Sequence, residues 1–149
     1  MTKNNKERFK MVATVHLFLM DGGKILLQRR YNTGYEDGNF GVPSGHIDGN
    51  ESIFEAGIRE AKEEIGIDIS KEHLQFAGVF HRNKSDGERL DFFFAVENWQ
   101  GDIVNKEPNK CDLLQWYTKE KLPENTIAYV RQAIELFEQG AAFCEYLEI

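Results

Sequence analysis

The sequence predicts one α+β domain in which a mixed β-sheet is sandwiched between helices, an α/β/α arrangement. Most apolar segments have the length and β-branched content of strands, while one amphipathic helix comes early in the chain and another comes late. The 149 residues can build a sizeable core, and 41% hydrophobic and 29% charged content is ordinary for a globular protein. Because no repeat or long linker interrupts the chain, residues 1–149 are expected to form a single domain.

The first predicted elements are a hairpin and a long loop. Residues 11–20 and 24–30 are apolar, strand-like runs, and the Asp-Gly-Gly between them is typical of a tight turn. The glycine-rich stretch 31–52 indicates a loop, with one short strand near residues 39–42.

An early helix is predicted over residues 52–65. Ser52 and Glu55 have the spacing of a capping box, and Gly66 suits the position that closes a helix. On a helical wheel, four apolar side chains fall within about 60° of one another and form a core-facing stripe. They are Phe54, Ile58, Ala61 and Ile65.

The remaining segments predict three strands and a second helix. The strands are residues 74–82, 90–97 and 113–117, and an Asp-Gly turn joins the first two. Residues 126–139 predict an amphipathic helix that Gly140 ends, and the tail, residues 141–149, is either irregular or a short strand.

Charge and cysteine content narrow the classes of partner. The net charge of −7 argues against a broad basic surface for nucleic acid, although a metal ion can bridge an acidic site to a small anion. Cys111 and Cys144 have no CxxC spacing, so a cytoplasmic location is expected. Residues 11–20 contain His16, are too short to span a membrane and lack a cleavage site, so no membrane partner is expected.

Three glutamates crowd the second half of the early helix. On the wheel, Glu60, Glu63 and Glu64 span about 100° on one face, where like charges at these spacings repel by about 0.2–0.5 kcal/mol per pair. The helix macrodipole also favours cations there. One interpretation is a solvated acidic face; the other is a site for a hard cation, Mg²⁺ or Mn²⁺, which would relieve the repulsion. Gly57, which costs about 1 kcal/mol inside a helix, indicates that another group approaches the backbone closely.

The run from Gly45 to Ile67, GHIDGNESIFEAGIREAKEEIGI, resembles the Nudix box, G-x5-E-x7-R-E-U-x-E-E-x-G-U with U a bulky apolar residue. The matching positions are Gly45, Glu51, Arg59, Glu60, Glu63, Glu64, Gly66 and Ile67. Ala61 is smaller than the first U position usually holds, and Ser44 stands where relatives often have a second glycine. The predicted strand order also agrees with the fold of that family.

This resemblance implies an enzyme that breaks a phosphoanhydride bond in a nucleoside diphosphate derivative. The favoured substrate is a (deoxy)nucleoside triphosphate or a damaged nucleotide, giving a nucleoside monophosphate and pyrophosphate. The resemblance also implies that Mg²⁺, or alternatively Mn²⁺, is bound by three glutamates and a backbone carbonyl: Glu60, Glu63, Glu64 and Gly45. It implies that Arg59 orients the glutamates, while Glu51 and Gly66 are structural and Glu51 buttresses the loop.

The general base is open, because family members use either a glutamate of the box or one on a later loop. Glu107 is the favoured later glutamate and a further metal ligand, and Glu88 and Glu97 are weaker alternatives.

Four residues outside the box are candidates for substrate binding. Arg30 is expected to contact phosphate, and Asn125 either reads a base or caps the last helix. His81 and Arg82 end a predicted strand that faces the cleft. The expected partner is a small-molecule nucleotide, with no nucleic acid and no membrane, and a homodimer is compatible with the family.

Three alternatives remain. The domain is a nucleotide sensor without activity, it cleaves another nucleoside diphosphate derivative such as a nucleotide sugar, or it is an isoprenoid-diphosphate isomerase on the same fold. Because every charged residue of the box is present, a sensor is less favoured. Cys111 and Cys144 lie too late in the chain to match the isomerase arrangement.

Overall fold

One mixed β-sheet forms the centre of the molecule. The computed structural model describes residues 6–84 and 87–147. The strands in this part of the chain are β1 (Val12–Asp21), β2 (Lys24–Arg30), β3 (Phe40–Gly41), β4 (Ser44–His46), β5 (Gln75–Lys84), β6 (Gly87–Val96), β7 (Cys111–Thr118) and β8 (Phe143–Leu147). The helices are α1 (Ile53–Ile65) and α2 (Ala128–Glu138), and the 3-10 turns are η1 (Lys71–His73) and η2 (Lys119–Lys121).

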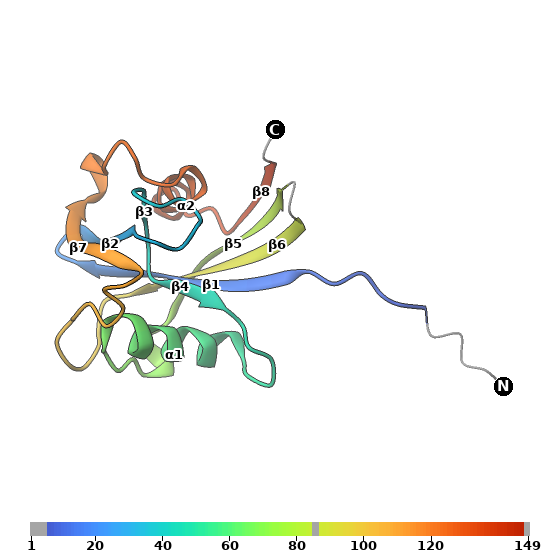
Figure 1. The fold of residues 1–149 in the computed structure, drawn as a ribbon, viewed down its shortest axis with the longest axis horizontal. Coiled ribbons are helices and arrows are strands. Elements are labelled where there is room, and N and C mark those ends of the chain that lie inside the picture. Colours follow the sequence, from blue (N-terminus) through green and yellow to red (C-terminus); the bar gives the residue numbers. More distant parts are fainter. Residues whose placement is uncertain (1–5, 85–86, 148–149) are drawn as a thin grey trace.

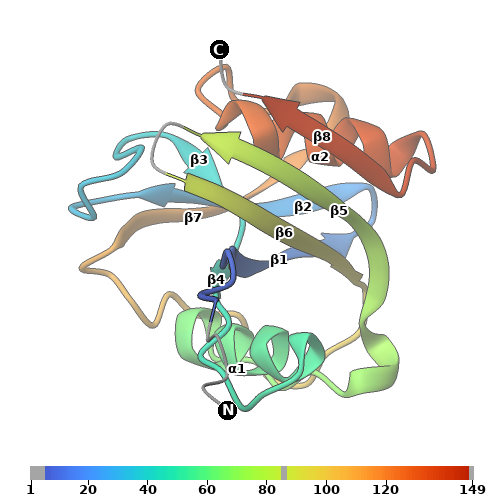
Figure 2. The same cartoon turned by 90° about the vertical axis from the view of Figure 1, so that its right-hand side faces the viewer.

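The two helices cover opposite sides of the sheet, with α1 below the strands and α2 above them in Figures 1 and 2. The strand order is β3-β2-β1-β6-β5-β8, while β4 pairs with β1 and β7 pairs with β2. The β1–β6 and β5–β8 pairs are parallel and the others are antiparallel, so the sheet is mixed. The sandwich that the sequence predicts is confirmed.

The two apolar cores follow from the alternation of side chains along β1. Val15, Leu17 and Leu19 pack in the cluster that contains the buried residues of α1, while Phe18 packs in the cluster that contains those of α2. All four are fully buried. The strand β1 is therefore apolar on both faces, which explains why its sequence is a nearly continuous hydrophobic run.

The strands β1 and β2 separate soon after their hairpin. They pair at Met20↔Ile25 and Asp21↔Lys24, beside the glycine turn, whereas the first half of β1 pairs with β4 through Thr14↔His46. The strand β4 therefore takes the place next to β1 that β2 leaves.

The ends of α1 match their sequence signals. The Ser52 hydroxyl accepts a hydrogen bond from the Glu55 N–H, the Glu55 carboxylate accepts one from the Ser52 N–H, and Gly66 closes the helix with a φ of 74°. A Cβ on Gly57 would lie 3.3 Å from Val15 Cγ2. The expected close approach to this glycine is therefore the core side chain of β1.

Several boundaries differ from the sequence prediction. The strand β4 was not expected, because its three residues lie in a glycine-rich stretch without strand periodicity. The tail forms β8, which pairs with β5. The expected Asp-Gly turn includes residues 85 and 86, which lie outside the described residues. In the described ranges, no helix has the length and apolar character that crossing a membrane would require.

The capping box predicts a measurable contribution to stability. Replacing an N-cap serine with alanine costs about 1 kcal/mol, and for a domain of this size about 1 kcal/mol lowers the melting temperature by roughly 2–4 °C. We expect Ser52→Ala to show this loss in thermal unfolding followed by circular dichroism.

Ser70→Ala is the matched control, because Ser70 stands at the N-cap of η1 without a side-chain capping bond. Equal melting temperatures for Ser52→Ala and Ser70→Ala would contradict the role assigned to the capping box.

Candidate active site

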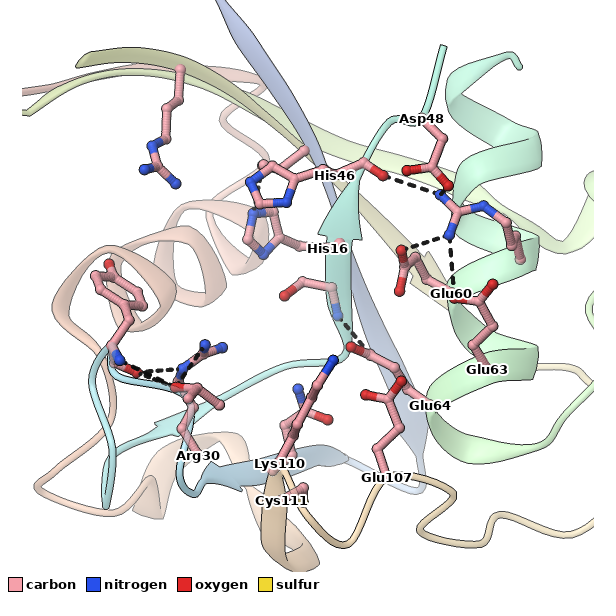
Figure 3. A pocket seen from close by; sticks show the side chains of 18 of the residues that line it. His16, Arg30, His46, Asp48, Glu60, Glu63, Glu64, Glu107, Lys110 and Cys111 are labelled. Carbon is pink, nitrogen blue, oxygen red and sulfur yellow. Dashed lines mark hydrogen bonds and ion pairs between the residues drawn. The ribbon is translucent and has the colours of Figure 1, made fainter. Parts of the chain in front are cut away.

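A cavity of about 470 Å³ lies beside β4, with walls from α1, β1, β2, β5, the loop before β7 and α2. Figure 3 shows the glutamates of α1 on one side of β4, with His16 and Arg30 on the other. This volume is within the usual range of small-molecule sites, about 300–1,000 Å³. Most site residues predicted from the sequence line it: Gly45, Arg59, Glu60, Glu63, Glu64, Glu107, Arg30 and Arg82.

The backbone of β4 lies directly against two of the glutamates. The Ser44 N–H donates a hydrogen bond of 2.9 Å to Glu64 Oε2. A Cβ built on Gly45 would overlap the Glu60 carboxylate, so no larger residue fits there without displacing that carboxylate. Glu60 is buried and Glu64 is partly buried, while Glu63 is exposed. The solvated acidic face considered for this helix is therefore wrong for Glu60 and Glu64.

Arg59 connects the helix to the loop that precedes it. Its guanidinium donates two hydrogen bonds to Glu51, of 2.8 and 3.0 Å, one of 2.8 Å to Glu60 and one of 3.3 Å to Glu63. It also donates to the His46 carbonyl at the end of β4. One side chain thus fixes two cavity carboxylates relative to the strand.

Glu51 holds the loop in the same network. Its Oε1 accepts a hydrogen bond of 2.9 Å from the Asp48 N–H in addition to those from Arg59. The Arg59 guanidinium and then the Asp48 N–H lower the pKa of Glu51 to about 2. Glu51 is therefore ionised at neutral pH.

The pKa values of Glu60 and Glu64, unlike that of Glu51, are raised. Burial, which outweighs the pairing with Arg59, raises the pKa of Glu60. Burial and then the charge of Glu60 raise the pKa of Glu64 well above its ordinary value. Part of Glu64 stays accessible from the cavity, but its carboxyl lies deep among protein atoms. Without a cation, the site therefore disfavours full ionisation of both groups.

Glu107 reaches the same carboxylates from the loop before β7, as Figure 3 shows. The loop is fixed to the end of α1 because the Lys106 N–H donates to the Glu64 carbonyl at 3.0 Å. The charge of Glu107 contributes to the raised pKa of both Glu60 and Glu64. The structure thus brings Glu107 to the glutamates of α1.

The donor set of this wall fits a hard divalent cation. It consists of carboxylates and the backbone carbonyl of Gly45, and such all-oxygen sets suit Mg²⁺ or Mn²⁺. Within residues 6–84 and 87–147, no three acidic, His or Cys side chains already converge as a complete metal-binding group. Arg59 and the Ser44 N–H hold the carboxylates of α1 instead.

Arg30 faces the cavity because successive side chains of a strand point to opposite faces, and Gln28, two residues earlier, lines the same cavity. Arg29 pairs with the exposed Asp112 at 2.8 Å. Arg30 instead donates to the Tyr35 carbonyl at 2.7 Å and to Thr33 Oγ1 at 3.2 Å. Two neighbouring arginines therefore have different surroundings, and the second arginine is the one in the cavity.

His81 and Arg82 separate, because successive side chains of a strand point to opposite faces. Arg82 is buried in the cavity wall and pairs with Asp91 at 2.8 Å. His81 pairs with Glu88 at 2.9 Å and does not line the cavity. The structure therefore does not bring His81, or the alternative base Glu88, to the site.

Asn125 and Glu97 also lie outside the cavity wall. The Asn125 amide donates to the Gly38 carbonyl at 2.7 Å, which ties the loop before β3 to the loop before α2. It is not the helix cap either, because the N-cap position of α2 is Ile127, which makes no capping bond. The capping role considered for Asn125 is therefore wrong, while base recognition by Asn125 stays a prediction.

The cavity contains residues that sequence reasoning missed. Thr14 and His16 of β1 bind the buried Asp91 carboxylate, Tyr129 of α2 covers Arg82, and Lys110 points into the cavity beside Glu107. The signal available for His16 was a polar residue inside an apolar strand. Cys111 also lines the wall, although its late position in the chain does not match the isomerase arrangement. Burial raises the pKa of its thiol, which donates to the Leu113 carbonyl at 3.3 Å.

The fold is thus a mixed sheet between two helices, and its cavity lies where the glutamates of α1 pack against β4, the strand that contains Gly45. The chain belongs to the Nudix family, since the family model for the NUDIX domain matches residues 10–137. The sequence resemblance to that family is confirmed.

Curated relatives differ in the activities that their names give. The chain is 36% identical over 91 residues to Nudix hydrolase 10 of Arabidopsis thaliana, covering 60% of this chain and 32% of that protein. It is 27% identical over 128 residues to the NAD-capped RNA hydrolase NudC of Pseudomonas aeruginosa, covering 81% and 43%. It is 28% identical over 125 residues to a putative 8-oxo-dGTP diphosphatase of Bacillus subtilis, covering 84% and 78%. The chain thus spans less than half of the first two relatives.

A solved structure shares the fold. The crystal structure of a MutT NUDIX hydrolase from Burkholderia pseudomallei superposes with a TM-score of 0.78 at 23% identity, covering 85% of this chain and 98% of that chain. The likeness supports the architecture of sheet and helices described above.

The raised pKa values of Glu60 and Glu64 predict a pH dependence of stability. A carboxyl whose pKa is raised on folding binds more protons when folded, so its contribution is full below the unfolded pKa and is lost as pH rises through the folded pKa. In EDTA, the melting temperature is expected to fall from pH 5 to pH 8. Each kcal/mol lost corresponds to about 2–4 °C.

Glu64→Gln is expected to flatten this slope and to melt at a higher temperature than wild type at pH 8, measured by differential scanning calorimetry. Glu72→Gln, at an exposed glutamate of η1, is the control and should keep the wild-type slope. A Glu64→Gln protein with the full wild-type slope would show that this carboxyl is not the group responsible.

Proposed function

We propose that this domain is a divalent-metal-dependent hydrolase that breaks a phosphoanhydride bond in a nucleoside diphosphate derivative. The favoured substrate is a (deoxy)nucleoside triphosphate or a damaged nucleotide, which gives a nucleoside monophosphate and pyrophosphate. The observation that carries the proposal is the packing of the Glu60 and Glu64 carboxylates against the backbone of Ser44 and Gly45. Burial of like charges at one point is costly, and a bound cation offsets that cost.

Residues of this chain have separate roles in the proposed reaction. Glu60, Glu63, Glu64 and the Gly45 carbonyl would hold Mg²⁺, with Glu107 close enough to share in that site or to accept a proton from the attacking water. Arg59 positions the carboxylates through its hydrogen bonds. When bound, the metal neutralises phosphate charge and activates water. Arg30 would contact a phosphate, because its guanidinium is fixed in the cavity wall by Tyr35 and Thr33.

The names of the relatives support more than one substrate. The Bacillus subtilis relative is named for 8-oxo-dGTP, and this chain covers 78% of it. The Pseudomonas aeruginosa relative is named for NAD-capped RNA, but the chain covers 43% of that protein, and a net charge of −7 disfavours holding a long RNA. A small nucleotide is therefore the favoured substrate. A homodimer and a cytoplasmic location stay predictions.

A nucleotide panel tests the function. Wild-type protein with Mg²⁺ is incubated with nucleoside triphosphates, 8-oxo-dGTP, a nucleotide sugar, NAD-capped RNA and isopentenyl diphosphate, and products are separated by chromatography. Glu63→Gln is expected to lower turnover of the best substrate by about a hundredfold or more with an unchanged melting curve, since metal ligands position the reacting groups. Glu72→Gln is the control and should keep wild-type activity.

No turnover of any nucleotide with Mg²⁺ present would favour the sensor alternative. Isomerisation of isopentenyl diphosphate would favour the isomerase alternative. Cys111, which lines the cavity, would then be the cysteine available for that reaction. Wild-type rates in both Glu63→Gln and Glu64→Gln would contradict the assignment of the metal ligands.

Glu107 has its own test, because a general base and a binding residue affect different kinetic constants. We expect Glu107→Gln to lower kcat by about a hundredfold to ten-thousandfold, the usual contribution of general base catalysis, and to change KM little. Glu97→Gln, an exposed residue outside the cavity, should leave both constants unchanged. A defect of Glu107→Gln in KM alone would remove it from the role of base.

A further inference from the structure

One buried donor in the cavity wall has no partner. Arg82 is 2% exposed, and among the described residues its Nη1 is a buried side-chain nitrogen that makes no hydrogen bond. Buried polar groups are nearly always hydrogen-bonded, because an unmade bond costs about 1–3 kcal/mol or more for a charged group. A donor kept at this cost beside a cavity indicates that its partner is a molecule that enters the cavity.

The rest of the guanidinium is held rigidly. Arg82 Nε donates to Asp91 Oδ2 at 2.8 Å and Nη2 donates to Asp91 Oδ1 at 3.2 Å. The ring of Tyr129 lies against it, with the ring centroid 3.8 Å from Cζ. Because two nitrogens and one face are occupied, the edge that carries Nη1 is the part of the group left for a ligand.

Asp91 is held in turn by β1. Its Oδ1 accepts a hydrogen bond of 2.5 Å from Thr14 and lies 3.0 Å from His16 Nε2. Burial raises the pKa of Asp91, but the hydrogen bond and charge of His16, then Thr14 and Arg82, outweigh it and lower that pKa below the ordinary value. Asp91 is therefore ionised and neutralises Arg82.

This neutralisation decides which group Nη1 suits. A guanidinium already paired with a buried carboxylate offers little net charge to a phosphate, but it still offers one directed N–H. The acidic wall that would hold the metal lies across β4 from His16, whose ring contacts Asp91, the partner of Arg82 (Figure 3). A neutral acceptor on the nucleoside part of the substrate is the better match.

Tyr35 is a further neighbour of Arg82, on the loop between β2 and β3. Its side chain interacts with Arg82 and lines the cavity, and its hydroxyl accepts a hydrogen bond of 2.8 Å from Lys84. Because Tyr35 belongs to a loop, its side chain can turn aside without breaking the sheet.

From these contacts, and resting on the proposed function, we infer that Arg82 is a specificity-determining residue that donates its Nη1 hydrogen bond to the keto oxygen at position 6 of a purine or position 4 of a pyrimidine. Substrates with hypoxanthine, guanine or uracil are preferred over their amino counterparts, because an exocyclic amino group presents hydrogen atoms to a donor that needs an acceptor.

Matched nucleotide pairs test the inference. The kcat/KM of wild-type protein is measured for ITP against ATP and for UTP against CTP, and each keto nucleotide is expected to be preferred by about tenfold to a hundredfold, the range for one hydrogen bond to a charged group. Arg82→Lys keeps a charge beside Asp91 but removes the fixed Nη1, so the preference should fall to about threefold or less. Arg29→Lys, at an exposed pair outside the cavity, is the control and should keep the preference.

A structural role alone would lower the activity of Arg82→Lys on both members of a pair equally, and that result would overturn the inference while the proposed function stands. Equal kcat/KM values for each pair in wild type would overturn it too. No hydrolysis of any triphosphate would overturn the inference, whereas the proposed function falls only if no nucleotide of the whole panel is cleaved. If Arg82→Lys does not fold, purine riboside triphosphate, which lacks the exocyclic oxygen, gives the test on wild type alone. It should be cleaved no faster than ATP, and cleavage as fast as ITP would refute the assignment.

Discussion

The burial of two carboxylates against the backbone of one short strand is the constraint on which the candidate site depends. Glu64 accepts a hydrogen bond from the Ser44 N–H, and Glu60 occupies the space that a side chain at position 45 would fill. The Glu60 carboxylate could not lie there if position 45 carried a larger residue, and Glu64 depends on the register that presents the Ser44 N–H to it. The raised pKa values of both groups follow from this packing, with burial as the largest cause.

The fold provides this contact by separating β1 from β2. After the hairpin the two strands diverge, and β4 enters beside the first half of β1. The glutamates of α1 then approach β4 from one side, while Thr14 and His16 line the cavity from β1. An acidic wall for a cation and a rigid Asp91–Arg82 pair thus share one cavity. The same strand β1 supplies apolar side chains to the cores under both helices.

The sequence predicted the parts of the structure that have local signals. The periodicity and caps of residues 52–65 gave α1 within one residue, and the apolar runs gave the long strands. It could not give β4, because three residues in a glycine-rich loop have no periodicity and form a strand only through their pairing with β1. Spacing placed the box glutamates on one helix face, but only the tertiary contact with β4 shows which of them are buried.

The positions of the other predicted site residues also depend on contacts between distant parts of the chain. Strand alternation separates His81 from Arg82, which adjacency in the sequence cannot reveal without knowing which face of β5 meets the cavity. Asn125 binds a carbonyl 87 residues earlier in the chain, and Thr14 and His16 bind Asp91 at separations of 77 and 75. Contacts at such separations come from the sheet order, so no local pattern predicts them.

Proton release on metal binding is the sharpest test of whether the buried carboxylates Glu60 and Glu64 form a cation site. Mg²⁺ is titrated into the protein by isothermal titration calorimetry at pH 7 in buffers with different ionisation enthalpies. Since a cation binds ionised carboxylates and the pKa values of Glu60 and Glu64 are raised, binding should release protons in wild type and fewer in Glu64→Gln. Binding with the same proton release in both proteins, or no Mg²⁺ binding in wild type, would show that these carboxylates are not a cation site.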